Sequence, residues 1–178
     1  MSYGKAQLED LTIKLKKIRD ALLYELPEYW WLSQGEAAVV VVRMVKKNKK
    51  INIFETPKLT LKAAIRTVIE NIEVAKKLKG TDFFKVMQII EEDIANIADV
   101  YFMIKEAHEV VKKMESLKRM VSSSDLHKTK KDELTKILNS AIKWIKEVFS
   151  TNPRDWKKRK EYFEKIANKV EEQLKVTE

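Results

Sequence analysis

The sequence predicts an all-α fold, a bundle of five or six helices with one long central helix. The chain of 178 residues contains three glycines and three prolines, too few for the many tight turns of a β-sandwich. Along most of its length, apolar residues recur at alternating spacings of three and four, the period of one helix face. Because 44% of the residues are hydrophobic, the chain can bury a substantial core.

The first predicted helix covers residues 5–26 and ends at Pro27, which cannot continue a helix. An aromatic corner of Tyr29, Trp30 and Trp31 follows. Two neighbouring indoles are difficult to bury together in a loop, so this corner is the candidate protein interface. The alternative is that the rings cover the end of the bundle. The apolar seam of the helix consists of Leu8, Leu11, Leu15, Ile18 and Leu22.

Residues 33–54 allow two interpretations. Ser33 and Glu36 form a capping box, which favours a helix through Lys47. The valine run at residues 39–42, and the polar stretch between two apolar segments, are also typical of a small β-hairpin near residues 39–54. We favour the helix and keep the hairpin as the alternative. Both interpretations bury the valines and expose the lysines Lys46, Lys47, Lys49 and Lys50.

Four more helices are expected, with Gly80 as the cap between the first two and an exposed loop at residues 122–131. Their ranges are residues 59–78, 82 to about 120, 131–149, and 153–176 with Pro153 in the first turn. We expect a main helical bundle of residues 1–121 and a C-terminal helical hairpin of residues 122–178, packed on the bundle or on another subunit. A single domain of residues 1–178 is the alternative.

Composition restricts the class of protein. The chain has no cysteine, which excludes disulfides, thiolate nucleophiles and cysteine-based metal sites. The first residues lack the apolar stretch of a secretory signal, and the longest apolar run, residues 37–42, is too short to span a bilayer. We therefore expect a cytoplasmic protein without membrane contact. Abundant Lys and Glu with scarce Gln are typical of hyperthermophile proteins. In composition, but in no motif, the chain resembles small lysine-rich proteins of archaeal viruses and mobile elements, and small subunits of archaeal CRISPR effector complexes.

No Gly-rich phosphate loop, dinucleotide fingerprint or nucleophile elbow occurs in the sequence. His108 lies on the apolar seam of the long helix, where a packed structural histidine is expected. The acidic group at residues 91–93, with Asp99 beyond it, is expected to form a solvated helix face with ion pairs. The sequence therefore predicts no enzyme activity, no catalytic residue, no cofactor and no metal. A metal-dependent enzyme that uses His108 and the acidic group is the least favoured alternative.

The formal net charge of +9 is concentrated in two segments, since residues 43–62 carry +6 and residues 128–160 carry +7. Such segments can neutralise phosphates and release their counterions, which drives association with nucleic acid. In the second segment, lysines at spacings typical of one helical stripe lead toward a basic cluster around Trp156. We expect Trp156 either to stack on a base or to be buried. The hypothesis requires that the two segments form one continuous cationic surface.

The favoured hypothesis is a non-enzymatic helical protein that contacts the backbone of DNA or RNA, as part of an assembly. Lysines outnumber arginines thirty to six, which predicts binding without strong sequence preference. The rival hypothesis is a structural or adaptor protein whose partner is another protein or a second copy of itself. The candidate nucleic-acid-binding residues are Lys46, Lys47, Lys49, Lys50, Lys136, Lys143, Lys146, Arg154, Trp156, Lys157, Lys158 and Arg159.

Overall fold

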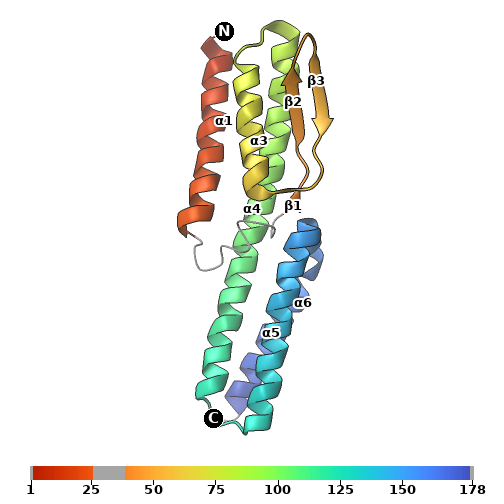
Figure 1. The fold of residues 1–178 in the computed structure, drawn as a ribbon. Coiled ribbons are helices and arrows are strands. Elements are labelled where there is room, and N and C mark those ends of the chain that lie inside the picture. Colours follow the sequence, from red (N-terminus) through yellow and green to blue (C-terminus); the bar gives the residue numbers. More distant parts are fainter. Residues whose placement is uncertain (1, 26–38, 177–178) are drawn as a thin grey trace. The chain divides into compact units, whose positions relative to one another are not determined.

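The structure of the protein is a computed structural model that describes residues 2–25 and 39–176. In this part of the chain, five α-helices, one of them 44 residues long, and a small antiparallel hairpin confirm the predicted fold class (Figure 1). The chain divides into two compact units, Met1–Phe102 and Met103–Glu178. The division falls within the long helix α4 (Gly80–Ser123), whereas the sequence places its boundary at the end of that helix.

The helices of the first unit bury their apolar seams in one core. Helix α1 (Ser2–Asp20), which continues as a π-helical turn at Ala21–Glu25, packs on α3 (Leu61–Ala75). Helix α3 begins where the Thr60 hydroxyl accepts a hydrogen bond from the Ala63 N–H at 3.1 Å, an N-cap. The buried side chains of this core include Leu8, Leu15, Leu22, Ile65, Val68, Ile72, Ile90 and Ile94.

Two glycines shape the ends of these helices. Gly80 has a φ of 63°, a left-handed conformation that favours glycine, and it is the first residue of α4 rather than the cap of α3. The C-cap of α3 is Lys76. At Gly4 an added Cβ would lie 2.8 Å from Cζ of Phe83, so a larger residue here would have to displace the Phe83 ring.

Residues 43–55 form a β-hairpin, and the favoured helical interpretation is wrong over residues 39–47. Strand β2 (Arg43–Lys47) pairs antiparallel with β3 (Ile51–Glu55), and Val45 lies opposite Ile53. Two shorter strands, β1 (Val39–Val40) and β4 (Leu59–Thr60), pair at the base of the hairpin. Val40, Val42 and Val45 are buried while Val41 and Lys46 are exposed. β-Branched side chains pack well on one face of a pleated strand, so the local capping signal is overridden.

The edge of β2 that does not pair with β3 is bonded by side chains from α3 and α4. The Asn71 side chain of α3 accepts a hydrogen bond from the Val45 N–H at 3.0 Å and donates one to the Arg43 carbonyl at 2.7 Å. The Asp93 carboxylate of α4 accepts a hydrogen bond from the Arg43 N–H at 3.0 Å. Because buried backbone groups need partners, these two side chains hold the hairpin on the helices.

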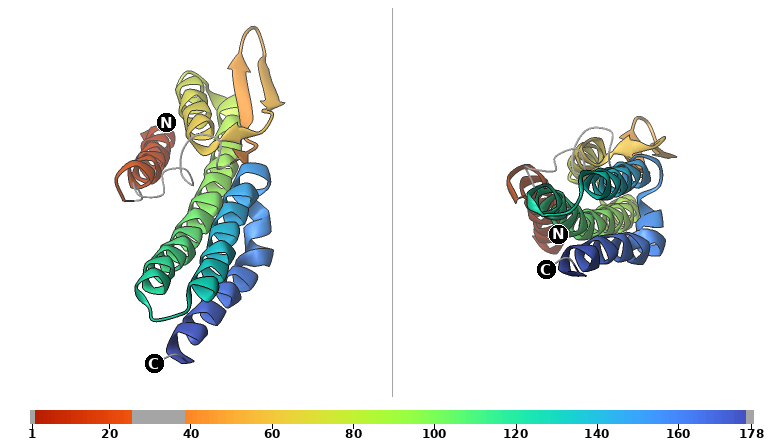
Figure 2. Two further views of the ribbon diagram at one scale, coloured as in Figure 1. Left: turned by 60° about the horizontal axis from the view of Figure 1, so that its bottom comes forward. Right: turned by 90° about the horizontal axis from the view of Figure 1, so that it is seen from below.

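The second unit contains the C-terminal half of α4, α5 (Lys128–Thr151) and α6 (Trp156–Val176), with both later helices beside α4 (Figure 2). Helix α5 begins three residues earlier than predicted because the ring of His127 accepts a hydrogen bond from the Thr129 N–H at 3.2 Å and caps it. A 3₁₀ turn, Pro153–Asp155, connects α5 to α6. None of the helices in the described ranges combines the length and the apolar character that a membrane crossing requires.

Candidate nucleic-acid interface

The first basic segment is exposed at the tip of the β2–β3 hairpin. Lys46, Lys47, Lys49 and Lys50 are all exposed there, as the sequence predicts. Arg43, at the start of β2, belongs to a different environment. Its guanidinium forms ion pairs with Glu92 and Asp93 of α4. Within residues 43–50, the exposed positive charge is therefore the lysine group of the tip.

The prediction of a solvated face for the acidic group is wrong for Asp93, which is 5% exposed. Glu92 and Asp93 both pair with Arg43. Burial raises the pKa of Asp93, and hydrogen bonds and ion pairing with Arg43 oppose that rise. Glu92 is the more exposed partner of the same arginine. These contacts explain the carboxylates without a bound ion. Within the described residues, no group of three or more histidine or acidic side chains could hold a metal.

His108 belongs to the second unit and is 2% exposed. Burial disfavours the charged imidazolium and lowers the pKa of His108 to about 4. The ring is therefore neutral at neutral pH. A base with so low a pKa is poorly matched to proton transfer at that pH.

The second basic segment presents its predicted stripe on α5. Lys136, Asn139, Lys143 and Lys146 are exposed and lie on one side of the helix at spacings of three and four. The opposite side is buried in the core of the unit through Leu134, Leu138, Ala141 and Ile145. The stripe is therefore turned to solvent because the core holds the other face of the helix.

Trp156 has to be removed from the candidate interface, because its side chain is 0% exposed. The ring stacks on Phe163, with centroids 5.9 Å apart and planes 12° apart, and contacts Phe149 at 5.8 Å. The turn at Pro153–Asp155 directs this first residue of α6 into the core rather than toward the neighbouring cations. A ring enclosed in this way cannot stack on a base.

A different tryptophan, which sequence reasoning missed, lies at the surface of the same helix pair. Trp144 of α5 is 38% exposed and contacts Tyr162 of α6 edge-on, with centroids 5.5 Å apart. The guanidinium carbon of Arg159 lies 5.2 Å from the centre of the Trp144 ring, a cation–π contact. Tyr162 is 50% exposed. The α5–α6 pair therefore brings two accessible rings and an arginine to one place.

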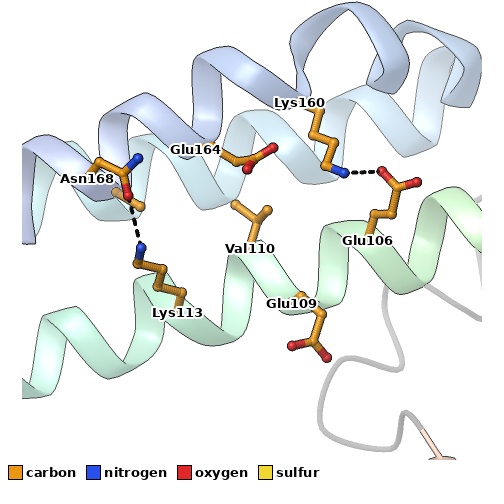
Figure 3. Close-up of a pocket in the computed structure, with 8 residues that line it drawn as sticks. Glu106, Glu109, Val110, Lys113, Lys160, Glu164 and Asn168 are labelled. Carbon is orange, nitrogen blue, oxygen red and sulfur yellow. Dashed lines mark hydrogen bonds and ion pairs between the residues drawn. The ribbon is translucent and has the colours of Figure 1, made fainter.

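The remaining cations of α6 differ in their surroundings. Lys157 and Lys158 are exposed, as is Arg154 of the preceding 3₁₀ turn. Lys160 forms an ion pair of 2.8 Å with Glu106 of α4, which raises the pKa of Lys160 through the hydrogen bond to the carboxylate (Figure 3). Lys160 is therefore engaged in a contact within the unit and is not counted among the cations offered to a partner.

The groove that contains this ion pair has a volume of about 470 Å³ and carries both signs of charge. Across the groove, the Lys113 ammonium donates a hydrogen bond to the Asn168 side-chain oxygen at 2.9 Å (Figure 3). Glu109 and Glu164 also line the groove. Lysines and carboxylates there are mixed or paired, so the groove does not offer a field of one sign to an anionic chain.

Tyr29, Trp30 and Trp31, the predicted protein interface, lie outside the described residues. A signal for Trp144 existed in the sequence, since it precedes Ile145 and thus falls beside the seam of Leu138, Ala141 and Ile145 rather than on it. Comparison with known proteins adds no assignment, because no family model, no curated protein and no solved structure matches the chain.

Proposed function

We propose that this protein is a non-enzymatic nucleic-acid-binding protein that contacts the phosphate backbone without strong sequence preference. The main contact is the α5–α6 surface, defined as Lys136, Lys143, Lys146, Lys158 and Arg159. The observation that carries the proposal is the exposure of these five cations on two adjacent helices whose other faces are buried.

The chemistry of this surface favours the backbone over base edges. Lysine ammonium groups are flexible point charges that neutralise phosphates without a fixed geometry. Each contact releases condensed counterions, so affinity falls steeply as salt concentration rises. Of the five cations, only Arg159 has the planar fork that suits bidentate recognition.

The hairpin tip is a second cationic surface, in the other unit, so the function proposed here does not depend on one continuous cationic surface, as the hypothesis from the sequence did. Lys46, Lys47, Lys49 and Lys50 lie within five positions of one another along β2 and its turn. A hairpin of two strands is narrow enough to enter a groove of nucleic acid. We assign it an auxiliary contact with phosphates, which can be tested separately from α5–α6.

Binding is tested by fluorescence anisotropy with labelled DNA and RNA at increasing salt. The variant with Lys136, Lys143 and Lys158 all changed to Gln loses three contacts, so the slope of log K against log salt falls by about 2 to 3. A matched control changes Lys14, Lys16 and Lys17 of α1 to Gln, which removes the same charge from exposed helical positions. Absence of binding at about 50 mM salt, or equal loss in both variants, contradicts the proposal.

Exposed aromatic side chains in the first unit favour a second candidate function, a structural or adaptor protein. Phe84 and Phe102 of α4 are 70% and 58% exposed and lie about five helical turns apart on one face. Such rings are typical of protein contacts. A stable oligomer in light scattering that is insensitive to salt, and is lost when Phe84 and Phe102 become Ala, would support this function over nucleic-acid binding.

A further inference from the structure

We propose that Trp144 and Tyr162 form a stacking platform that makes the α5–α6 surface select single-stranded over duplex nucleic acid. This inference rests on the function proposed above and specifies its ligand. In a single strand, the phosphates can contact the cations while an unpaired base stacks on an exposed ring. In a duplex, the bases are already paired and stacked on each other.

The exposure of these two rings is the first argument. The same helix pair buries Trp156 completely between Phe149 and Phe163, so the core of this unit can enclose an indole. Trp144 nevertheless remains 38% exposed and Tyr162 50% exposed. Accessible aromatic surface therefore remains next to the cationic side chains.

The fixed arrangement of the rings is the second argument. Trp144 contacts Tyr162 edge-on at 5.5 Å and the buried Phe163 edge-on at 5.6 Å. These contacts come from α6 and anchor the indole to the core, so little side-chain freedom is lost when a base is bound. A base that contacts Trp144 or Tyr162 thus meets a platform that is already assembled.

Arg159 connects the platform to the phosphates. Its guanidinium lies 5.2 Å from the centre of the Trp144 ring. A guanidinium on an aromatic face keeps N–H donors for a phosphate oxygen, which an ammonium does less well. Lys143, adjacent to Trp144, and Lys158, adjacent to Arg159, are both exposed. Each helix of the pair therefore carries an exposed lysine within a few residues of the platform, besides Arg159 at the Trp144 ring itself.

Nearby carboxylates reduce the positive field but do not remove it. Glu147 is exposed one turn beyond Lys143 on α5. Glu161, beside Tyr162, forms an ion pair of 3.5 Å with Lys165. Residues 143–159 contain six cations and two carboxylates, an excess of four positive charges. This excess favours an anionic ligand at the platform.

The test compares three labelled probes of equal length, about 15 nucleotides: a polythymidine strand, an abasic strand with the same phosphates, and a duplex. The full chain is titrated with each probe in anisotropy experiments at low salt. We expect the polythymidine strand to bind about 5- to 150-fold more tightly than the abasic strand for each stacked base. The duplex should show no such gain over its own backbone contacts.

Variants separate stacking from folding. Trp144→Leu and Tyr162→Leu should reduce the preference for polythymidine over the abasic strand, whereas Trp144→Phe, which keeps an aromatic face, should retain most of it. Tyr24→Leu, at an exposed tyrosine of the other unit, is the matched control. A variant that has lost its fold loses affinity for the abasic strand as well, so that probe reports on folding.

The outcomes distinguish the two proposals. Equal affinity for the polythymidine and abasic strands, a preference for the duplex, or a preference unchanged in Trp144→Leu overturns the stacking platform while leaving backbone binding intact. Absence of binding to all three probes overturns the proposed function itself, and the platform with it.

Discussion

The bonding of the β2 edge by Asn71 leads to a sharp prediction for Asn71→Ala. The Asn71 side chain is 1% exposed and satisfies two backbone groups, the Val45 N–H at 3.0 Å and the Arg43 carbonyl at 2.7 Å. Alanine leaves the Val45 N–H buried without that partner, and the Arg43 carbonyl unpaired in a partly buried position. Because the edge of β2 packs against α3, water has little access to the Val45 N–H.

The magnitude follows from the two lost bonds. A buried polar group left unpaired costs about 1–3 kcal/mol. One buried donor, one partly buried acceptor and a small cavity therefore predict a loss of about 3 kcal/mol. The control is Asn52→Ala, the same substitution at an exposed position of β3 in the same hairpin. Its effect should remain within about 0.5 kcal/mol.

Two measurements check this prediction. Urea unfolding gives the change in free energy, and native-state hydrogen exchange gives the protection of the Val45 amide. For a local loss of about 3 kcal/mol, this amide should exchange roughly 100-fold faster in Asn71→Ala than in the wild type. If its protection is unchanged, or if Asn52→Ala has the same effect, the account of the hairpin edge is wrong.

Two other changes test the second unit. The pKa of His108 is about 4 in the folded chain and about 6.5 when unfolded, so the unfolded state binds more protons as pH falls through that window. The contribution of the neutral ring to the free energy of unfolding is therefore complete above pH ~6.5 and decreases by up to ~3 kcal/mol toward pH ~4. In urea unfolding, His108→Gln should lose this pH dependence. A difference in stability between the two proteins that is constant with pH would contradict this account. Trp156→Ala should cost about 3–5 kcal/mol in thermal or urea unfolding, and Trp144→Ala distinctly less because Trp144 is partly exposed. Trp156→Phe should cost less than Trp156→Ala, since the buried indole N–H has no acceptor within the described residues; a loss as large as that of alanine would contradict this reasoning.

The helices could be predicted from the sequence because their signals are local. Alternation of apolar residues at three and four determines a buried face within each helix, as in Leu134, Leu138, Ala141 and Ile145 of α5. Pro153 marks the turn between α5 and α6 in the sequence and in the structure. The exposure of Lys136 and Lys143 follows from the same period, since they lie opposite the apolar seam.

The hairpin at residues 43–55 could not be chosen over a helix by local signals. Its stability depends on hydrogen bonds to Asn71 and Asp93, which lie 26 and 50 residues away from their partners in the chain. A capping box and a run of valines give opposite indications over the same few positions. The hairpin is favoured over a helix only when α3 and α4 supply hydrogen-bond partners for the edge of β2.

The environment of each tryptophan also depended on the tertiary structure. Trp144 and Trp156 both adjoin basic residues in the sequence, and the pattern of charge favoured Trp156. The turn at Pro153–Asp155 directs Trp156 into the core and leaves Trp144 at the surface with Arg159 and Tyr162. Outside residues 39–54, the sequence by itself determined where the described helices lie and which of their faces are apolar, because the helical period acts over one or two turns. Only the packing of distant segments decided which aromatic ring is accessible, because burial depends on the side chains that the fold brings around it.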